Sequence, residues 1–177
     1  MNAMNKKAKL TEKILDKALE NAFRKSPEFC QWFLGRTKKF SDRNATYHWS
    51  RSNHPWGTVP ITGKNPETGI EETIKRQSET DVLVVFESQG GKRIALHIEN
   101  KLNANFTEFQ VQDYPTRAAH WVGKSKYRNY LEFDTVLIAP SSYLQKHQTE
   151  AKHFGCCISH EEIAEHLPIF HGYFVRN

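Results

Sequence analysis

The stretch from Glu79 to Lys101, ETDVLVVFESQGGKRIALHIENK, decides the fold of this chain. It contains two runs rich in Val, Ile and Leu, Asp81–Phe86 and Arg93–Glu99, on either side of the turn residues Gln89-Gly90-Gly91. Short apolar runs that flank a glycine-rich turn are typical of a β-hairpin. Because consecutive residues are apolar in both runs, both faces of each strand require cover, and we expect two central strands of a sheet.

Charged residues stand at the open end of this predicted hairpin. With the turn at Gly90 and Gly91, Asp81 and Glu99 lie opposite each other, and directly opposed residues have Cβ atoms about 4.5–5.5 Å apart. Two neighbouring carboxylates can share one cation, and hard oxygen ligands suit Mg²⁺ or Mn²⁺. Lys101 is two residues from Glu99 and therefore points to the same face, where it can orient water or neutralise charge on a phosphate.

Glu79 shares the face of Asp81 and is a further candidate metal ligand. Two carboxylates, a metal and a lysine on one face form a plausible centre for phosphodiester hydrolysis. The alternative is that these residues are strand-end charges that face solvent or pair with one another.

The rest of the chain predicts a mixed α/β domain. One helix is expected after the N-cap Thr11, and a second from Ser26-Pro27 to about Gly35. Asn105-Phe-Thr-Glu108 predicts a capping box for a helix that carries Phe106, Phe109 and Gln110 to Tyr114 and then kinks or restarts at Pro115. Further strands are expected at Ile70–Arg76, Thr135–Ala139, Cys156–Ile158 and Ile169–Val175, and further helices at Ser142–His153 and, after the Ser159–Glu162 capping box, to His166.

The length of 177 residues predicts one domain over residues 11–177, preceded by a flexible basic arm at residues 1–10. Residues from about 40 to 69 are rich in Pro and Gly and predict a loop-rich insertion, with a short strand at most. Their aromatic and basic residues favour either stacking on a nucleic acid strand or packing back onto the core. These residues are Tyr47, His48, Trp49, Arg51, His54 and Trp56.

The bulk composition adds broader expectations. A net charge of +5 favours polyanionic partners. The three cysteines predict buried thiols, and His160 and His166 are expected on the surface. No apolar stretch approaches the roughly 20 residues that span a bilayer, so no membrane association is expected, and a cytoplasmic protein is the default expectation.

At this point the motifs resemble a known family. Glu79-Thr-Asp81 followed by Ile98-Glu99-Asn-Lys101 is similar to the PD-(D/E)XK nuclease superfamily, with Thr80 where the motif has proline. Gln110-Val-Gln-Asp-Tyr114 is similar to the QxxxY motif of its RecB-like exonuclease branch. The resemblance implies a restriction-endonuclease-like α/β core, with a helix, a three-stranded antiparallel hairpin sheet, a helix and a strand in a mixed central sheet flanked by helices.

The resemblance also implies residue roles in a Mg²⁺- or Mn²⁺-dependent deoxyribonuclease. Asp81, Glu99 and the backbone carbonyl of Asn100 would bind metal, and Lys101 would be catalytic. Gln110 and Tyr114, one helical turn apart, would lie beside the centre. Many members add an acid from the first helix, for which Glu12 and Glu20 are candidates.

Two alternatives stay open. An inactive nucleic-acid-binding module on the same fold would pair its carboxylates with Lys101 or Arg76, and an RNA-directed nuclease would share the site. The chain is expected to act alone, as a homo-oligomer or as a subunit of a larger nuclease system.

Overall fold

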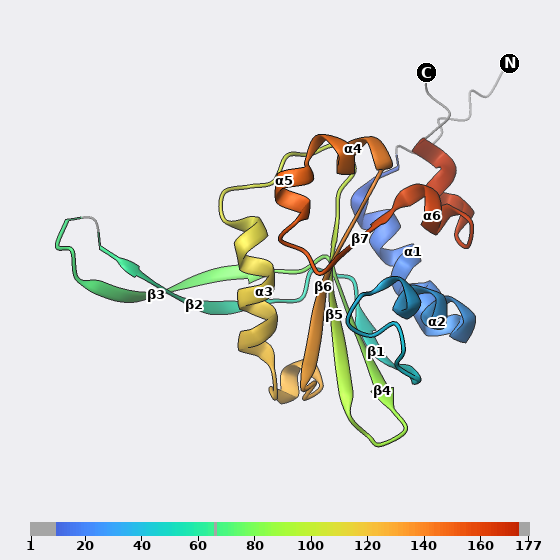
Figure 1. Ribbon diagram of the computed structural model, residues 1–177, viewed down its shortest axis with the longest axis horizontal. Coiled ribbons are helices and arrows are strands. Elements are labelled where there is room, and N and C mark those ends of the chain that lie inside the picture. Colours follow the sequence, from blue (N-terminus) through green and yellow to red (C-terminus); the bar gives the residue numbers. More distant parts are fainter. Residues whose placement is uncertain (1–9, 66, 174–177) are drawn as a thin grey trace, which may run out of the picture.

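The computed structural model describes residues 10–65 and 67–173, with a mixed five-stranded sheet at its centre (Figure 1). The strand order is β1-β4-β5-β6-β7. β1, β4 and β5 are antiparallel, whereas β5, β6 and β7 are parallel. The predicted α/β class with a mixed central sheet is therefore confirmed. The strands are β1 (Ala45–Arg51), β4 (Val82–Ser88), β5 (Arg93–Asn100), β6 (Glu132–Ala139) and β7 (Cys156–Ser159).

The hairpin predicted from the opening stretch is present as β4 and β5. Gly91 takes a left-handed conformation (φ 74°) and its N–H donates to the Ser88 carbonyl, which closes the turn. The register pairs Val82 with Ile98, so that Asp81 and Glu99 follow as the next opposed pair. All residues of β4 from Val82 to Phe86 are buried, as expected for a central strand.

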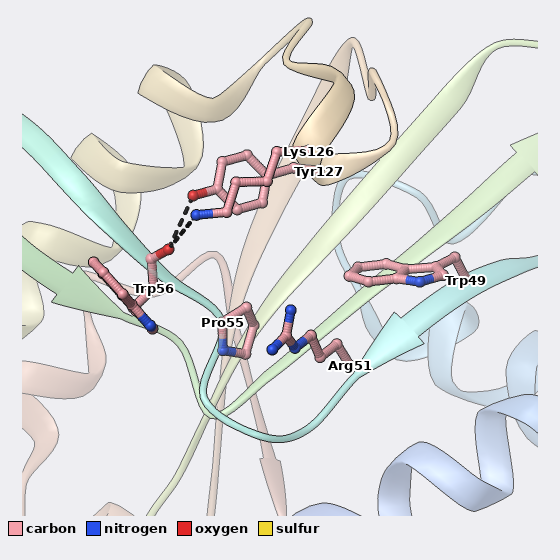
Figure 2. Close-up of a pocket in the computed structure, with 6 residues that line it drawn as sticks. All are labelled: Trp49, Arg51, Pro55, Trp56, Lys126 and Tyr127. Carbon is pink, nitrogen blue, oxygen red and sulfur yellow. Dashed lines mark hydrogen bonds between the residues drawn. The ribbon is translucent and has the colours of Figure 1, made fainter.

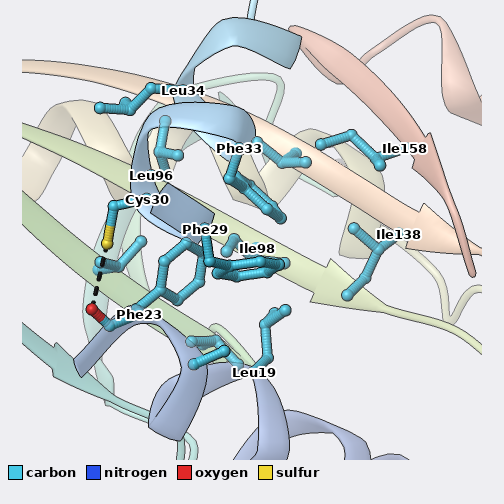
Figure 3. Packing of buried hydrophobic residues seen from close by; sticks show 14 of the residues in the cluster. Leu19, Phe23, Phe29, Cys30, Phe33, Leu34, Leu96, Ile98, Ile138 and Ile158 are labelled. Carbon is cyan, nitrogen blue, oxygen red and sulfur yellow. Dashed lines mark hydrogen bonds between the residues drawn. The ribbon is translucent and has the colours of Figure 1, made fainter. Parts of the chain in front are cut away.

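One face of the sheet is covered by α1 (Glu12–Lys25) and α2 (Pro27–Arg36), together with α6 (His160–Ala164) and the 3-10 helix η2 (Pro168–Tyr173) (Figure 1). The two N-terminal helices begin as predicted, since the Thr11 hydroxyl accepts from the Ile14 N–H at 3.4 Å and the Ser26 hydroxyl from the Phe29 N–H at 3.0 Å. Apolar side chains from these helices and from all five strands of the sheet meet in the main core. Figure 3 shows part of this packing, including Leu19, Phe23, Phe33, Leu96, Ile98, Ile138 and Ile158.

The opposite face carries α3 (Gln110–Trp121), the short helices α4 (Ser141–Lys146) and α5 (Gln148–Ala151), and the 3-10 helix η1 (Ser125–Tyr127). Val111 and Tyr114 of α3 pack on Leu137 of β6. Trp121 packs on the buried side chains of β4 and β5 that point to this side. The three layers explain why the central strands are apolar on both faces. In the described part of the chain, no helix combines the length and the apolar character needed to cross a membrane.

The prediction for residues 40–69 allows one short strand in a loop-rich insertion, and it underestimates the strand content. This segment contains β1 and also β2 (Trp56–Lys64), which pairs with β3 (Glu71–Glu79) in a separate two-stranded ribbon that projects from the sheet (Figure 1). The strand expected at Ile70–Arg76 is present as β3, but it belongs to this ribbon, and the strand next to β4 in the central sheet is β1. A ribbon strand has one free edge, and such a strand tolerates Pro60 because a proline without an N–H can face that edge.

Several local predictions also need correction. The capping box at Asn105–Glu108 does not form, because α3 begins only after Phe109, which takes a left-handed conformation (φ 66°). The helix runs without interruption through Pro115. The single helix expected at Ser142–His153 is divided at His147 into α4 and α5.

The C-terminal region holds both confirmed and wrong predictions. The Ser159 capping box is present, with the Glu162 N–H donating to the Ser159 hydroxyl. Residues 168–173 form η2 and not a strand, and residues 174 and 175 lie outside the described part, as does most of the predicted basic arm. His160 is fully buried and not on the surface, whereas His166 is exposed as expected. Cys30 and Cys156 are buried free thiols.

Candidate metal centre

Asp81 and Glu99 meet at the open end of the β4–β5 hairpin, where the sequence places them. Asp81 immediately precedes β4 and its Oδ2 accepts from the Asn100 N–H at 2.8 Å. Its backbone N–H points to the Tyr114 hydroxyl at 3.4 Å. Burial raises the pKa of Asp81 well above its usual range, and the negative charges of Glu99 and Asp16 raise it further. Such a site binds a cation more readily than it holds free negative charge.

Asp16 is the acid that the first helix contributes to this cluster, and the sequence analysis missed it. The side chain is fully buried, and its Oδ1 accepts from the Asn100 side-chain amide at 2.7 Å. Its Oδ2 has no hydrogen-bond partner among the described residues. Burial raises the pKa of Asp16 to about 7 against the opposing effect of the Asn100 hydrogen bond, with a further contribution from the charges of Glu12 and Glu99.

His54 brings an imidazole between the carboxylates. Its Nε2 lies 3.8 Å from Asp16 Oδ2, and its Nδ1 lies 3.6 Å from Asp81 Oδ1 and 3.5 Å from Glu79 Oε1. His54 has a left-handed backbone (φ 48°), which turns the loop between β1 and β2 toward the cluster. One ligand atom each from Asp16, His54 and Asp81 lies within 4.8 Å of the others. Two carboxylates and an imidazole are a donor set that fits a divalent cation, and Asp16 Oδ2 and His54 Nε2 have no hydrogen-bond partner among the described residues.

Glu99 is held by three neighbours rather than left open. Its Oε1 accepts from the Gln110 amide at 2.7 Å and lies 2.8 Å from the Lys101 Nζ. Its Oε2 accepts from the Tyr114 hydroxyl. Lys101 Nζ also lies 3.2 Å from Gln110 Oε1. The structure therefore brings together Glu99, Lys101 and the two residues of the QxxxY motif, whose spacing of one helical turn aims both at Glu99.

The protonation state of Tyr114 follows from its surroundings. Burial, followed by the charge of Glu99, raises the pKa of Tyr114 well above its usual value. The phenol therefore keeps its proton and acts as a donor toward Glu99, fixing the direction of one carboxylate oxygen.

Asn100, the middle residue of the Glu99–Lys101 motif, links the cluster to distant elements. Its N–H binds Asp81 and its side-chain amide binds Asp16. Since the amide nitrogen donates to Asp16, the amide oxygen accepts from His160 Nε2, at 2.9 Å. Burial lowers the pKa of His160 to about 3, so the ring is neutral. Asn100 thus orients Asp81 through its backbone N–H and Asp16 through its side-chain amide, and the contact with His160 fixes that side-chain amide.

The remaining predicted ligands lie differently. Glu20 is buried at 2.8 Å from both Lys17 and Arg24 and also accepts from Ser52. Burial raises the pKa of Glu20, but the hydrogen bonds from Lys17 and Ser52 and both positive charges outweigh burial, and the pKa is lowered. The negative charge of Glu20 is therefore already balanced by Lys17 and Arg24, and Glu20 does not belong to the group of Asp16, His54 and Asp81.

Glu12 and Glu79 lie at the margin of the cluster. Glu12 Oε1 accepts from the Leu102 N–H at 2.9 Å, next to the end of β5, and its charge acts on Asp16. Glu79 at the end of β3 has a side chain that is 60% exposed and reaches the cluster through His54. Both can contribute negative charge at the rim of the site.

Comparisons with protein-family models, with curated proteins and with solved structures find no match to this chain. The site must therefore be interpreted from its own chemistry.

Proposed function

We propose that the chain is a divalent-metal-dependent phosphodiesterase that hydrolyses DNA. The observation that carries this proposal is that one ligand atom each from Asp16, His54 and Asp81 lies within 4.8 Å of the others, beside the Glu99–Lys101 pair. Among the described residues, Asp16 Oδ2 and His54 Nε2 have no hydrogen-bond partner. A phosphodiester is an anion, and both a cation and a lysine would stabilise the charge that builds up on it during hydrolysis.

The metal would be held by Asp16 and Asp81, with His54 as a further ligand. It would supply Lewis-acid stabilisation of phosphate charge and a more acidic water. The imidazole favours a transition metal such as Mn²⁺, whereas carboxylates alone suit Mg²⁺ equally. Cleavage supported better by Mn²⁺ than by Mg²⁺ is therefore expected.

Each remaining residue has a role that its contacts suggest. Lys101 would release Glu99 and neutralise the phosphate, because its Nζ is a buried cation 2.8 Å from Glu99 Oε1 and 3.2 Å from Gln110 Oε1. Gln110 and Tyr114 would hold Glu99 in place. Asn100 would orient Asp16 and Asp81 through its amide groups.

The chain order supports the resemblance to PD-(D/E)XK nucleases. A helix, α1, is followed by the antiparallel strands β1, β4 and β5, then by α3 and the parallel strand β6, with the motif residues at one end of the sheet. We propose a restriction-endonuclease-like core on this basis, with β2 and β3 as an insertion after β1.

A non-catalytic nucleic-acid-binding module is the second candidate. The ion pair between Lys101 and Glu99 favours it, because a carboxylate satisfied by lysine, tyrosine and glutamine needs no metal. Arg76 pairs with Asp113 of α3 at 3.0 Å and not with the cluster, so the second pairing expected for this candidate is absent among the described residues.

The test is to incubate the purified protein with single- and double-stranded DNA and with RNA, each with Mn²⁺, Mg²⁺ or EDTA. Asp81→Asn keeps an oxygen for the Asn100 N–H, so it should fold, bind Mn²⁺ weakly in calorimetry and cleave nothing. Lys101→Ala should bind Mn²⁺ and still cleave nothing. The exposed acid Asp42, changed to Asn, is the matched control and should behave as the unmodified chain.

The outcomes separate the candidates. Cleavage of DNA that needs Mn²⁺ and disappears in both variants supports the proposal, and cleavage of RNA alone moves the substrate to RNA. Binding of DNA without uptake of Mn²⁺ supports the binding module. Cleavage that survives in both Asp81→Asn and Lys101→Ala removes the proposed centre.

A further inference from the structure

A recess lies beside the loop that carries His54. It has a volume of about 150 Å³ and is lined by Trp49, Arg51, Pro55, Trp56, Lys126 and Tyr127 (Figure 2). Three of these residues are aromatic and two are cationic, and none of the six is acidic. Ligand sites for drug-sized molecules measure about 300–1,000 Å³, so this recess suits one flat ring rather than a whole folded ligand.

The aromatic surface in this recess is accessible. Trp56 is 56% exposed although it stands at the first position of β2. Lys126 Nζ lies 5.4 Å from the centroid of the Trp56 ring, and the Arg128 guanidinium lies 4.9 Å from the Trp49 ring. Trp49 is half-buried against the core, so Trp56 offers the exposed indole. An exposed indole beside positive charges is the arrangement with which proteins stack bases and neutralise the flanking phosphates of a single strand.

The recess is rigid beneath this surface. The Trp56 carbonyl accepts from Lys126 Nζ at 3.0 Å and from the Tyr127 hydroxyl at 3.1 Å (Figure 2). Tyr127 in turn stacks on Trp121, with ring centroids 3.8 Å apart and planes within 8°. Gly57 allows this packing, because a Cβ there would lie 2.5 Å from the Tyr127 hydroxyl oxygen. Trp56 is therefore presented by a fixed backbone and needs little ordering when a ligand binds.

The recess lies close to the acidic cluster, which consists of Asp16, His54 and Asp81. His54 belongs to the cluster, whereas Pro55 and Trp56 line the recess. Two residues span at most about 7 Å of chain. The Pro55 carbonyl accepts from the Thr80 N–H at 3.1 Å, and Thr80 adjoins Asp81. A strand with one phosphate at the cluster would therefore have a neighbouring nucleotide beside the recess.

We infer that this recess is a base-stacking subsite for single-stranded DNA, with Trp56 as the stacking platform and Lys126 and Arg51 as phosphate partners. The inference rests on the proposed function and specifies its substrate as a single strand. A base within a duplex has neighbours on both faces, and only an unstacked base can lie on the exposed face of Trp56.

The experiment measures binding separately from cleavage. Fluorescein-labelled (dT)12 and a 12-bp duplex are titrated in EDTA with fluorescence anisotropy, and tryptophan emission is followed with unlabelled (dT)12. We expect preferential binding of (dT)12, quenching of tryptophan emission, and at least tenfold weaker binding for Trp56→Ala, since one stacked base contributes about that factor or more. Trp56→Phe should keep most of the affinity but lose much of the quenching.

Matched controls use the same residue types elsewhere. Trp32→Ala removes a partly buried tryptophan that packs on His166, and it should leave (dT)12 affinity unchanged. Lys126→Gln should reduce the slope of log affinity against log salt by about 0.7, the amount expected for one lost phosphate contact on a single strand, whereas Lys146→Gln should not. Folding of each variant is checked by circular dichroism.

The inference and the proposed function fail in different ways. Unchanged (dT)12 binding by Trp56→Ala, or equal affinity for the duplex in the unmodified chain, overturns the subsite even if Mn²⁺-dependent cleavage is observed. Stacking on Trp56 without any metal-dependent cleavage supports the subsite and counts against the phosphodiesterase.

Discussion

Replacing Asp16 by asparagine should make the metal-free protein more stable at pH 8. The folded chain holds the pKa of Asp16 at about 7, above the 3.8 of an ordinary aspartate. A raised carboxyl pKa means that the folded state binds the proton more tightly than the unfolded state does. Stability is therefore complete below about pH 3.8, decreases as the pH rises to about 7, and stays lower above that. The amide in Asp16→Asn carries no charge and avoids this loss.

The magnitude follows from the same two values. A difference between 3.8 and about 7 corresponds to at most about 4 kcal/mol, at 1.36 kcal/mol per pH unit. The amide oxygen can still accept from Asn100, and the new amide N–H group faces His54 Nε2, so little is lost in exchange. We expect a gain of about 2–4 kcal/mol at pH 8, or roughly 5–15 °C in Tm for a chain of this size.

Thermal unfolding in EDTA, measured from pH 5 to pH 8, tests this expectation. The unmodified chain should lose stability over that range more steeply than Asp16→Asn, while Asp42→Asn, at an exposed site, should follow the unmodified chain. Mn²⁺ at about 100 times its Kd should stabilise the unmodified chain by about 2.7 kcal/mol and the variant much less. A variant that is less stable at pH 8 and still fully stabilised by Mn²⁺ would refute the argument.

Three further changes have defined expectations. Gly57→Ala should lower the free energy of unfolding by about 1–3 kcal/mol, because its Cβ would overlap the Tyr127 hydroxyl, whereas Gly63→Ala on the same strand meets open space and should change little in the same denaturant titration. Tyr114→Phe removes a hydroxyl bonded to the buried glutamate, and it should reduce DNA cleavage about 10- to 100-fold in a gel assay while leaving circular dichroism unchanged. Ser159→Ala removes the cap of α6 and should cost about 1 kcal/mol in thermal unfolding.

The sequence predicts those parts of the fold that depend on neighbouring residues. The β4–β5 hairpin, the caps at Thr11 and Ser26, and the strand before Pro140 all follow from local patterns and are present. The choice between β1 and β3 as the neighbour of β4 depends on long-range pairing. The β1 segment ATYHWSR does contain strand-forming residues, but the Pro and Gly residues that follow it concealed the strand.

The candidate site also contains residues that local patterns predict and residues that they do not. Asp81, Glu99, Lys101 and the Gln110–Tyr114 pair are gathered because strand and helix periodicities fix their directions. Asp16 could have been found, since it lies seven residues before the core residue Phe23 and therefore on the same face of α1.

No pattern in the sequence predicts that His54 belongs to the candidate site. Its approach to Asp16 and Asp81 depends on a left-handed backbone in a loop, a conformation that the residue type alone does not specify.

The hydrogen bond between Asn100 and His160 sets a limit on how far this chain can be shortened. The motif residues all lie before Pro140, so a minimal domain ending there would retain every one of them. It would lose β7, which leaves one edge of β6 open, and it would lose the imidazole that fixes the Asn100 amide. That amide could then rotate and present its oxygen to Asp16, turning an attraction into a repulsion. The last forty residues, which carry no recognisable motif, thus determine whether the acids keep their geometry.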